Sequence, residues 1–102
     1  MRNKMAETID ELTVSYTDEG IETTKELDKV VLTKGAWSTI MYKLVNWDKK
    51  KEAYGAPQYS IRRYQKRNGE YQQKSKFNIS SNDQAKKVID VLQNWLSEEE
   101  KA

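Results

Sequence analysis

Residues 57–79 read PQYSIRRYQKRNGEYQQKSKFNI, and this stretch decides the fold. Residues 57–66 alternate between two sets of side chains, as in a β-strand whose residues point to opposite faces in turn. One set is the more apolar and comprises Tyr59, Ile61 and Arg63. The other is polar and basic and comprises Ser60, Arg62, Tyr64 and Lys66. We therefore expect a strand with one apolar and one basic face.

The second half of this stretch is expected to return as a partner strand. Asn68-Gly69 is the strongest short signal for a tight hairpin turn, because both residue types tolerate positive φ. Residues 71–79 then alternate again, with Phe77 and Ile79 on one face. The opposite face is polar and basic, and it carries Lys74, Lys76 and Asn78. The two strands are predicted to form a hairpin whose basic faces match.

An amphipathic helix is predicted directly after the hairpin. Apolar residues recur there at helical spacing, and they are Ala85, Val88, Ile89, Leu92, Trp95 and Leu96. Either Ser80 or Ser81 can cap the N-terminus, because Asp83 and Gln84 follow three residues later. We expect the helix to fold back over the apolar face of the hairpin, to bury Trp95 in the core, and to fray from Ser97 onwards.

Residues 36–47, AWSTIMYKLVNW, predict a further strand that is apolar on both faces. One face carries Ile40, Tyr42 and Leu44, and the other carries Trp37, Thr39, Met41, Lys43, Val45 and Trp47. Two apolar faces need a second cover, which is either another chain or a ligand with stacking surfaces. The expected cover is a second copy, so a homodimer is predicted. Residues 48–56 are expected to form a loop, because they carry three lysines and a glycine and are followed by Pro57.

The N-terminal third is expected to add strands to the same sheet. Leu12, Val14 and Tyr16 alternate, a turn is predicted at 18–20, and residues 21–33 follow as another strand. Residues 1–10 are predicted to be a frayed lead, 11–97 a single domain and 98–102 a charged tail. The predicted fold class is α+β, with an antiparallel sheet of four to five strands followed by one long C-terminal helix.

The composition excludes several kinds of chemistry. The chain has 102 residues and contains no cysteine and no histidine, the side chains that most active sites use near neutral pH. Its four glycines stand singly rather than in a phosphate-binding loop. We therefore expect no enzyme, no cofactor and no metal site. No stretch approaches the ~20 apolar residues that span a bilayer, and the first fifteen residues do not form a secretory signal. A cytoplasmic, nucleoid-associated protein is expected.

Positive charge is concentrated in the middle of the chain. Residues 34–76 carry eleven basic and three acidic side chains, a net charge of +8, between segments with net charges of −4 and −2. Such a block indicates an anion-binding surface or, alternatively, a sheet face that lysines keep soluble. Interleaved aromatics favour a single nucleic-acid strand, because cations neutralise phosphates and flat rings stack on unpaired bases. The predicted contact residues are Arg62, Tyr64, Lys66, Lys74 and Lys76, extended by Lys43, Trp37 and Trp47.

A competing interpretation comes from a different functional class. Trp37 and Trp47 are residues of a type found more often in a core or a dimer interface than on a stacking platform. In this alternative the chain is a protein-interaction module, whose strand 36–47 meets a partner protein. Its lysines then only solubilise a sheet face.

The tract from Gly35 to Leu96 resembles a known family. The matching features are a strand that ends in Asn46-Trp47, the pattern Tyr59-x-Ile61-Arg62-x-Tyr64, and a lysine-led strand before one helix. This arrangement is similar to the positive-cofactor-four-like transcriptional coactivators. The resemblance implies a curved four-stranded antiparallel sheet, a dimer, and binding of single-stranded DNA at low specificity, with RNA as an alternative. The implied role lies in transcription, replication or repair.

The resemblance also assigns roles to individual residues. Arg62 and Tyr64 match the family's arginine and aromatic residue on the nucleic-acid face, and Lys76 matches its lysine in the last strand. Arg63 departs from the pattern, because family members usually carry an acidic residue there. The loop 48–56 is also longer than in the family.

Overall fold

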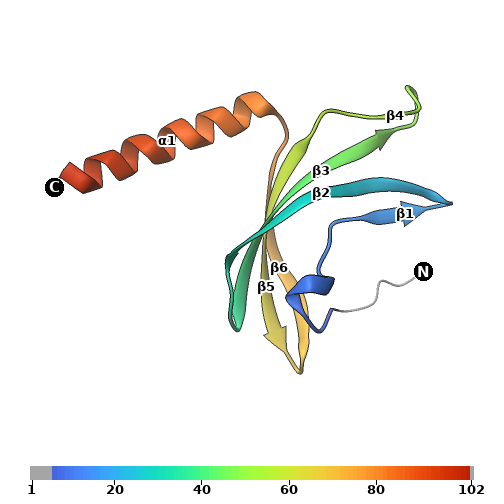
Figure 1. Cartoon of the computed structure of the whole chain (residues 1–102), viewed down its shortest axis with the longest axis horizontal. Coiled ribbons are helices and arrows are strands. Elements are labelled where there is room, and N and C mark those ends of the chain that lie inside the picture. The colour runs from blue at the N-terminus through green and yellow to red at the C-terminus, as the bar shows by residue number, and fades with distance from the viewer. Residues whose placement is uncertain (1–5, 102) are drawn as a thin grey trace.

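The computed structural model describes residues 6–101 and confirms the α+β class. Its elements are η1 (Ile9–Glu11), β1 (Tyr16–Asp18), β2 (Ile21–Thr33), β3 (Trp37–Asp48), β4 (Ala53–Tyr54), β5 (Gln58–Arg67), β6 (Glu70–Ile79) and α1 (Asn82–Lys101). The curled antiparallel sheet has the strand order β1-β2-β3-β5-β6, and the two-residue β4 pairs with the end of β3 (Figure 1). β6 is therefore an edge strand.

The predicted hairpin turn is confirmed. Asn68 and Gly69 join β5 to β6 with φ values of 52° and 80°, the left-handed conformation that a two-residue turn of this kind needs at both positions. The same solution recurs between β1 and β2, where Glu19 and Gly20 have φ values of 49° and 82°. Local turn chemistry thus fixes the start of both hairpins.

The two faces of the sheet differ in what covers them. The inner face of β3 carries Ile40, Tyr42 and Leu44, and these side chains are buried beneath an N-terminal segment, residues 6–15, that we call the strap. The strap contributes the buried residues Ala6, Ile9, Leu12 and Val14 to one cluster with the inner face. Residues 6–10 were expected to belong to a frayed lead. They are instead packed against the sheet, and residues 1–5 lie outside the described part.

One lysine fixes the strap to the sheet. Lys29 of β2 donates from Nζ to the carbonyl oxygens of Ile9 (2.5 Å), Leu12 (2.6 Å) and Asp10 (3.4 Å). Further along, the Thr13 hydroxyl donates to a carboxylate oxygen of Glu26 at 2.6 Å. Lys29 thus supplies a charged donor to carbonyls of the strap, of which that of Ile9 also accepts a hydrogen bond from the Leu12 amide at 3.1 Å.

The outer face of the sheet carries an apolar row that the strap does not reach. Val30, Met41, Ile61 and Phe77 are direct neighbours across four strands. Val30 and Phe77 are more than half exposed. This row accounts for the second apolar face predicted for β3.

The helix starts as predicted. The Ser81 hydroxyl accepts a hydrogen bond from the Gln84 amide at 3.1 Å, and the Gln84 side chain accepts one from the Ser80 amide at 2.9 Å. Ser81 is therefore the N-cap. The chain stays helical as far as Lys101, so the expected fraying from Ser97 is wrong.

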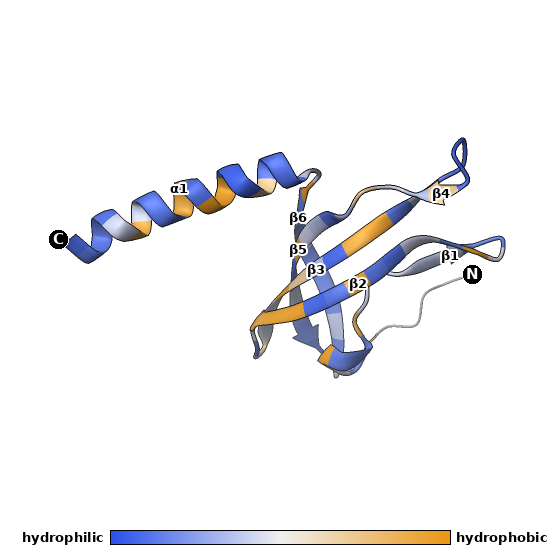
Figure 2. Cartoon of the chain, turned by 45° about the horizontal axis from the view of Figure 1, so that its top comes forward, coloured by the Kyte–Doolittle hydropathy of each residue, from blue (hydrophilic) through white to orange (hydrophobic). Residues whose placement is uncertain are grey.

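The path of the helix differs from the prediction. α1 leaves the end of β6 and projects away from the sheet, and none of its residues is buried (Figure 1). Trp95, expected in the core, is 60% exposed. Apolar residues run along the helix without a cover, as Figure 2 shows. The helical pattern correctly gave an apolar stripe, but periodicity does not tell which surface covers it. Among the described residues, no helix is apolar enough over a sufficient length to cross a membrane.

Candidate nucleic-acid interface

Arg62 occupies the middle of β5 on the inner face, opposite Ile40 of β3 and Lys76 of β6. Its Nε donates to the Ser60 hydroxyl at 3.1 Å, and one terminal nitrogen donates to the Gln73 side-chain oxygen at 3.1 Å. Both acceptors are neutral, so they orient the guanidinium without cancelling its charge. The planar group thus keeps donors for a phosphate, which it can bind in a bidentate manner.

Two lysines share this face with Arg62. Lys76 lies directly across from it and is exposed. Lys66 lies further along β5, opposite Tyr71, with its Nζ 5.3 Å from the centre of the Tyr71 ring. We call Arg62, Lys66 and Lys76 the inner strip. Of the five basic and aromatic residues predicted on the hairpin, the inner strip and Tyr64 are therefore on one face.

Neutral hydrogen-bonding groups accompany the inner strip. The Ser60 hydroxyl donates to the Asn78 side-chain oxygen at 2.7 Å. On the neighbouring strand β6, the Gln73 side-chain oxygen accepts a hydrogen bond from Arg62. Ser60 is fully buried, whereas Asn78 and Gln73 are exposed. The sequence interpretation assigned no role to Gln73, and its only signal was a position in the return strand.

Tyr64 was predicted to stack on a base, but it is buried. Its ring is 4% exposed beneath the strap, and its hydroxyl lies 3.0 Å from that of Tyr42. Burial is the main reason why the pKa of each phenol lies above its ordinary value. In this arrangement Tyr64 presents no free ring face, so its place in the site is as support for the inner face.

Three other predicted contact residues lie on the opposite side of the sheet. Trp37, Lys43 and Trp47 belong to the outer face, because Lys43 pairs with Tyr59 while its neighbour Tyr42 pairs with Ser60. The expectation that they extend the surface of Arg62 is therefore wrong. The even-numbered residues of β5, which include Arg62, lie on the same face as Ile40. Trp37 and Trp47 lie on the opposite face.

The outer face has aromatic and cationic groups of its own. Trp37 is 41% exposed, and the guanidinium carbon of Arg63 lies 4.4 Å from its ring centre. Trp47 is half-buried and meets the Tyr54 ring edge-on at a centroid distance of 5.1 Å. The sequence placed Arg63 on the face of Tyr59 and Ile61 and noted its departure from the family pattern, but assigned it no contact role.

Lys74 is separated from Lys76 by a β-bulge. The pairing runs from Arg63–Ser75 directly to Tyr64–Gln73, so Lys74 has no partner on β5. Its Nζ donates to Gln72 at 3.2 Å, and Gln72 is paired with Gln65 of the outer face. The prediction that both lysines share one face assumed unbroken alternation, which a bulge interrupts.

Within residues 6–101, no cluster of three metal-ligating side chains is found. The inner strip offers cations and amides, which bind anions and hydrogen-bonding groups. Compared with models of protein families, with curated proteins and with solved structures, the chain has no significant match.

Proposed function

We propose that this protein binds single-stranded DNA through the inner strip at low sequence specificity, with RNA as an alternative ligand. The observation that carries the proposal is the setting of Arg62, a partly exposed residue of β5 whose charge is oriented by two neutral acceptors. Lys66 and Lys76 add two further cations on the same face. Such a protein would act in transcription, replication or repair, beside the nucleoid.

The expected binding is electrostatic and sensitive to salt. Three cations can neutralise three phosphates, and each phosphate contact on a single strand contributes a slope of about −0.7 in log K against log salt. The inner strip alone therefore predicts a slope of about −2. Gln73 and Asn78 supply donors and acceptors for base edges, but such amides accept many bases, which agrees with low specificity.

Adjacent arginines provide a matched test of the face. Arg62 and Arg63 carry the same charge on the same strand and point to opposite faces. Fluorescence anisotropy with a labelled oligo-dT should show weaker binding for Arg62→Ala than for Arg63→Ala, with circular dichroism as the control for folding. Lys50→Ala, in the exposed loop, controls for the loss of one charge. If only Arg63→Ala weakens binding, the outer face with Trp37 is the interface. If the parent protein does not bind at low salt, the proposal fails.

We also propose that the functional unit is a homodimer. An isolated amphipathic helix is marginally stable in water, and α1 exposes Val91, Leu92, Trp95 and Leu96 to between 43 and 60%. The outer sheet row, from Val30 to Phe77, is a second uncovered apolar surface on the same chain. In a twofold pair, the helix of each copy can cover the apolar surfaces of the other, which closes the assembly.

Sedimentation equilibrium tests the dimer. The parent protein should have the mass of two chains, and Leu92→Asp with Trp95→Asp should shift it to one chain. Substitution of Glu99→Gln with Lys101→Gln, on the exposed last turn, serves as the control and should leave the mass unchanged. A parent protein that is monomeric at micromolar concentration would contradict the dimer. That result would favour the alternative function, a protein-interaction module whose helix docks on a different protein.

A further inference from the structure

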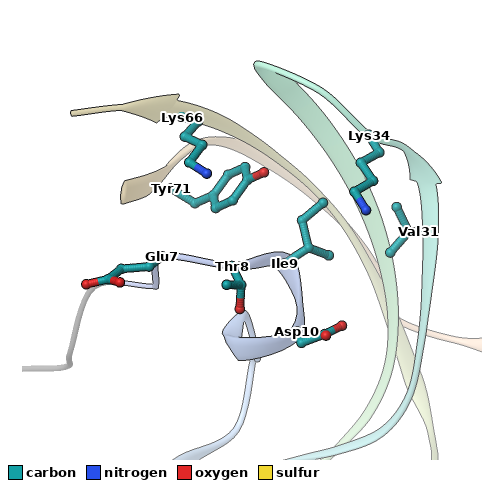
Figure 3. Close-up of a pocket in the computed structure, with 8 residues that line it drawn as sticks. All are labelled: Glu7, Thr8, Ile9, Asp10, Val31, Lys34, Lys66 and Tyr71. Carbon is teal, nitrogen blue, oxygen red and sulfur yellow. The ribbon is translucent and has the colours of Figure 1, made fainter. Parts of the chain in front are cut away.

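An open pocket lies at one end of the inner strip. It has a volume of about 450 Å³, which is large enough for a nucleotide-sized group. Its lining comes from the strap, the β2–β3 turn and the β5–β6 hairpin, and comprises Glu7, Thr8, Ile9, Asp10, Val31, Lys34, Lys66 and Tyr71 (Figure 3). Lys66 belongs to both the pocket and the inner strip.

Three polar groups of the pocket lack a side-chain hydrogen-bonding or acidic partner. In the described part of the chain, the ammonium groups of Lys34 and Lys66 form no ion pair, and the hydroxyl of Tyr71 forms no hydrogen bond. Figure 3 shows both ammonium groups over the space around Tyr71 and Ile9. Two cations and one hydroxyl donor therefore border the same cavity.

The remaining walls define what can fill the space. Ile9 and Val31 are apolar and can contact a sugar or a base. Glu7 and Asp10 lie on the strap side of the pocket, and the Glu7 carboxylate points away from Tyr71 in Figure 3. An anion is thus favoured only beside the lysines, while the acidic rim repels a second phosphate. These walls suit a ligand with one phosphate attached to an apolar group. They do not suit a run of consecutive phosphates.

The strap closes the inner strip at this end. The Tyr71 amide donates to the Ala6 carbonyl at 2.8 Å, so the chain of the strap crosses beside the start of β6. Arg62 and Lys66 are four residues apart on one strand, a separation of about 13 Å that a short nucleic-acid segment can bridge. Tyr64 lies between them on this face and is buried beneath the strap, so a strand that leads from Arg62 to Lys66 passes over the strap and can place its end at the pocket.

We propose that this pocket binds the terminal phosphate of a nucleic-acid strand, with Lys34, Lys66 and Tyr71 as its ligands. The proposal rests on the proposed function, because the inner strip delivers the strand end to the pocket. A phosphomonoester carries more negative charge than an internal phosphodiester and exposes three oxygens. Two lysines and a hydroxyl are a suitable donor set for such a group.

The test compares one oligo-dT in three forms: with a 5′-phosphate, with a 3′-phosphate and with neither. The parent protein should bind one phosphorylated form about fivefold to tenfold more tightly than the unphosphorylated form, the gain expected from one net hydrogen bond of ordinary strength. Lys34→Ala should abolish this preference and leave binding of the unphosphorylated form nearly unchanged. Lys50→Ala, the control, should retain the preference. Equal binding of all three forms by the parent would overturn the proposal.

Two further arms separate the sources of failure. Arg62→Ala should weaken the binding of all three oligonucleotides by the same factor. Loss of strand binding is therefore distinguishable from loss of recognition of the terminal phosphate. Thymidine 5′-monophosphate and inorganic phosphate, used as competitors, should remove the preference without displacing the unphosphorylated oligonucleotide. If inorganic phosphate competes as well as the mononucleotide, the apolar wall has no role. If the preference survives Tyr71→Phe and Lys34→Ala together, the phosphate is bound elsewhere and the assignment of this pocket is wrong.

Discussion

The hydroxyl groups of Tyr42 and Tyr64 lie 3.0 Å apart beneath the strap and form the one polar contact between side chains in the middle of the inner-face cluster among the described residues. The two rings belong to neighbouring strands, and each is at most 4% exposed. Each hydroxyl is the side-chain hydrogen-bond partner of the other, so the pair is satisfied without water. Tyr64 follows two arginines in the sequence, yet it is inaccessible because the strap covers it.

Removal of one of these two hydroxyls should lower the free energy of unfolding more than removal of both. Tyr64→Phe leaves the Tyr42 hydroxyl buried without its partner, for which we expect a loss of about 1–3 kcal/mol in the free energy of unfolding. The double variant Tyr42→Phe/Tyr64→Phe leaves no orphaned hydroxyl and should lose less than the sum of the two single variants. Urea unfolding of all four proteins measures the coupling. Additive losses would mean that the two hydroxyls do not interact in solution.

The same pair predicts a dependence of stability on alkaline pH. Burial raises the pKa of both phenols in the folded protein above the value of about 10 that tyrosine has in water. Above pH 10 the unfolded chain therefore releases protons that the folded chain retains, so it binds fewer protons than the native state. The free energy of unfolding should fall with rising pH by up to about 1.4 kcal/mol per pH unit for each tyrosine.

The double phenylalanine variant isolates this effect. Lysines also titrate in this range, but they do so in parent and variant alike. The difference in unfolding free energy between the two proteins should be constant from pH 7 to 9 and should shift in favour of the variant above pH 10. A constant difference up to pH 11 would show that the phenols ionise equally well in the folded state.

Local signals in the sequence predicted most elements of the fold. The turn at Asn68-Gly69, the alternation in 57–66 and the Ser81 cap each depend on residues that are neighbours along the chain, and all three are confirmed. The burial of Tyr64 depends instead on the strap, which is about fifty residues away along the chain. Nothing in the alternation of β5 indicates which segment covers its inner face.

The division of the candidate site between two faces has a similar cause. Trp37 and Arg62 are on opposite faces because Ile40 pairs with Arg62, and the register between distant strands is not encoded in either strand alone. The bulge at Lys74 also interrupts the alternation of side chains between the two faces, and no residue type in the sequence indicates it. Arg62, Lys66 and Lys76 share one hairpin, in which the turn pairs Lys66 with Tyr71 and the bulge at Lys74 then shifts the register by one residue and brings Lys76 opposite Arg62.

Lys29 should control the attachment of the strap. Its ammonium group is bound by the carbonyl oxygens of Ile9, Asp10 and Leu12, so Lys29→Met should leave these acceptors without a charged donor. We expect a loss of about 1–3 kcal/mol in unfolding free energy, together with faster amide hydrogen exchange in residues 6–15. Exchange in β5 and β6 should change less than exchange in the strap.

A lysine on the same strand provides the comparison. Lys25 points to the outer side, where its Nζ lies 5.6 Å from the Tyr54 ring centre. Lys25→Met removes the same charge and should leave exchange in the strap unchanged. Equal exchange in both variants would contradict the anchoring role of Lys29. If Lys29→Met also exposes Tyr64 to a stacking ligand, oligo-dT binding should increase, since the strap covers the two central tyrosines.

The two lysines of β6 make the last prediction, on the salt dependence of binding. Lys76 faces the inner strip opposite Arg62, whereas the bulge turns Lys74 towards Gln72. Lys76→Gln should therefore weaken oligo-dT binding and reduce the slope of log K against log salt by about 0.7, the value for one phosphate on a single strand. Lys74→Gln removes the same charge two residues away and should alter the slope much less. Anisotropy titrations at four salt concentrations resolve this difference. Equal slopes for the two variants would mean that the strand senses only the total charge of the hairpin, and the inner face would then have no special role.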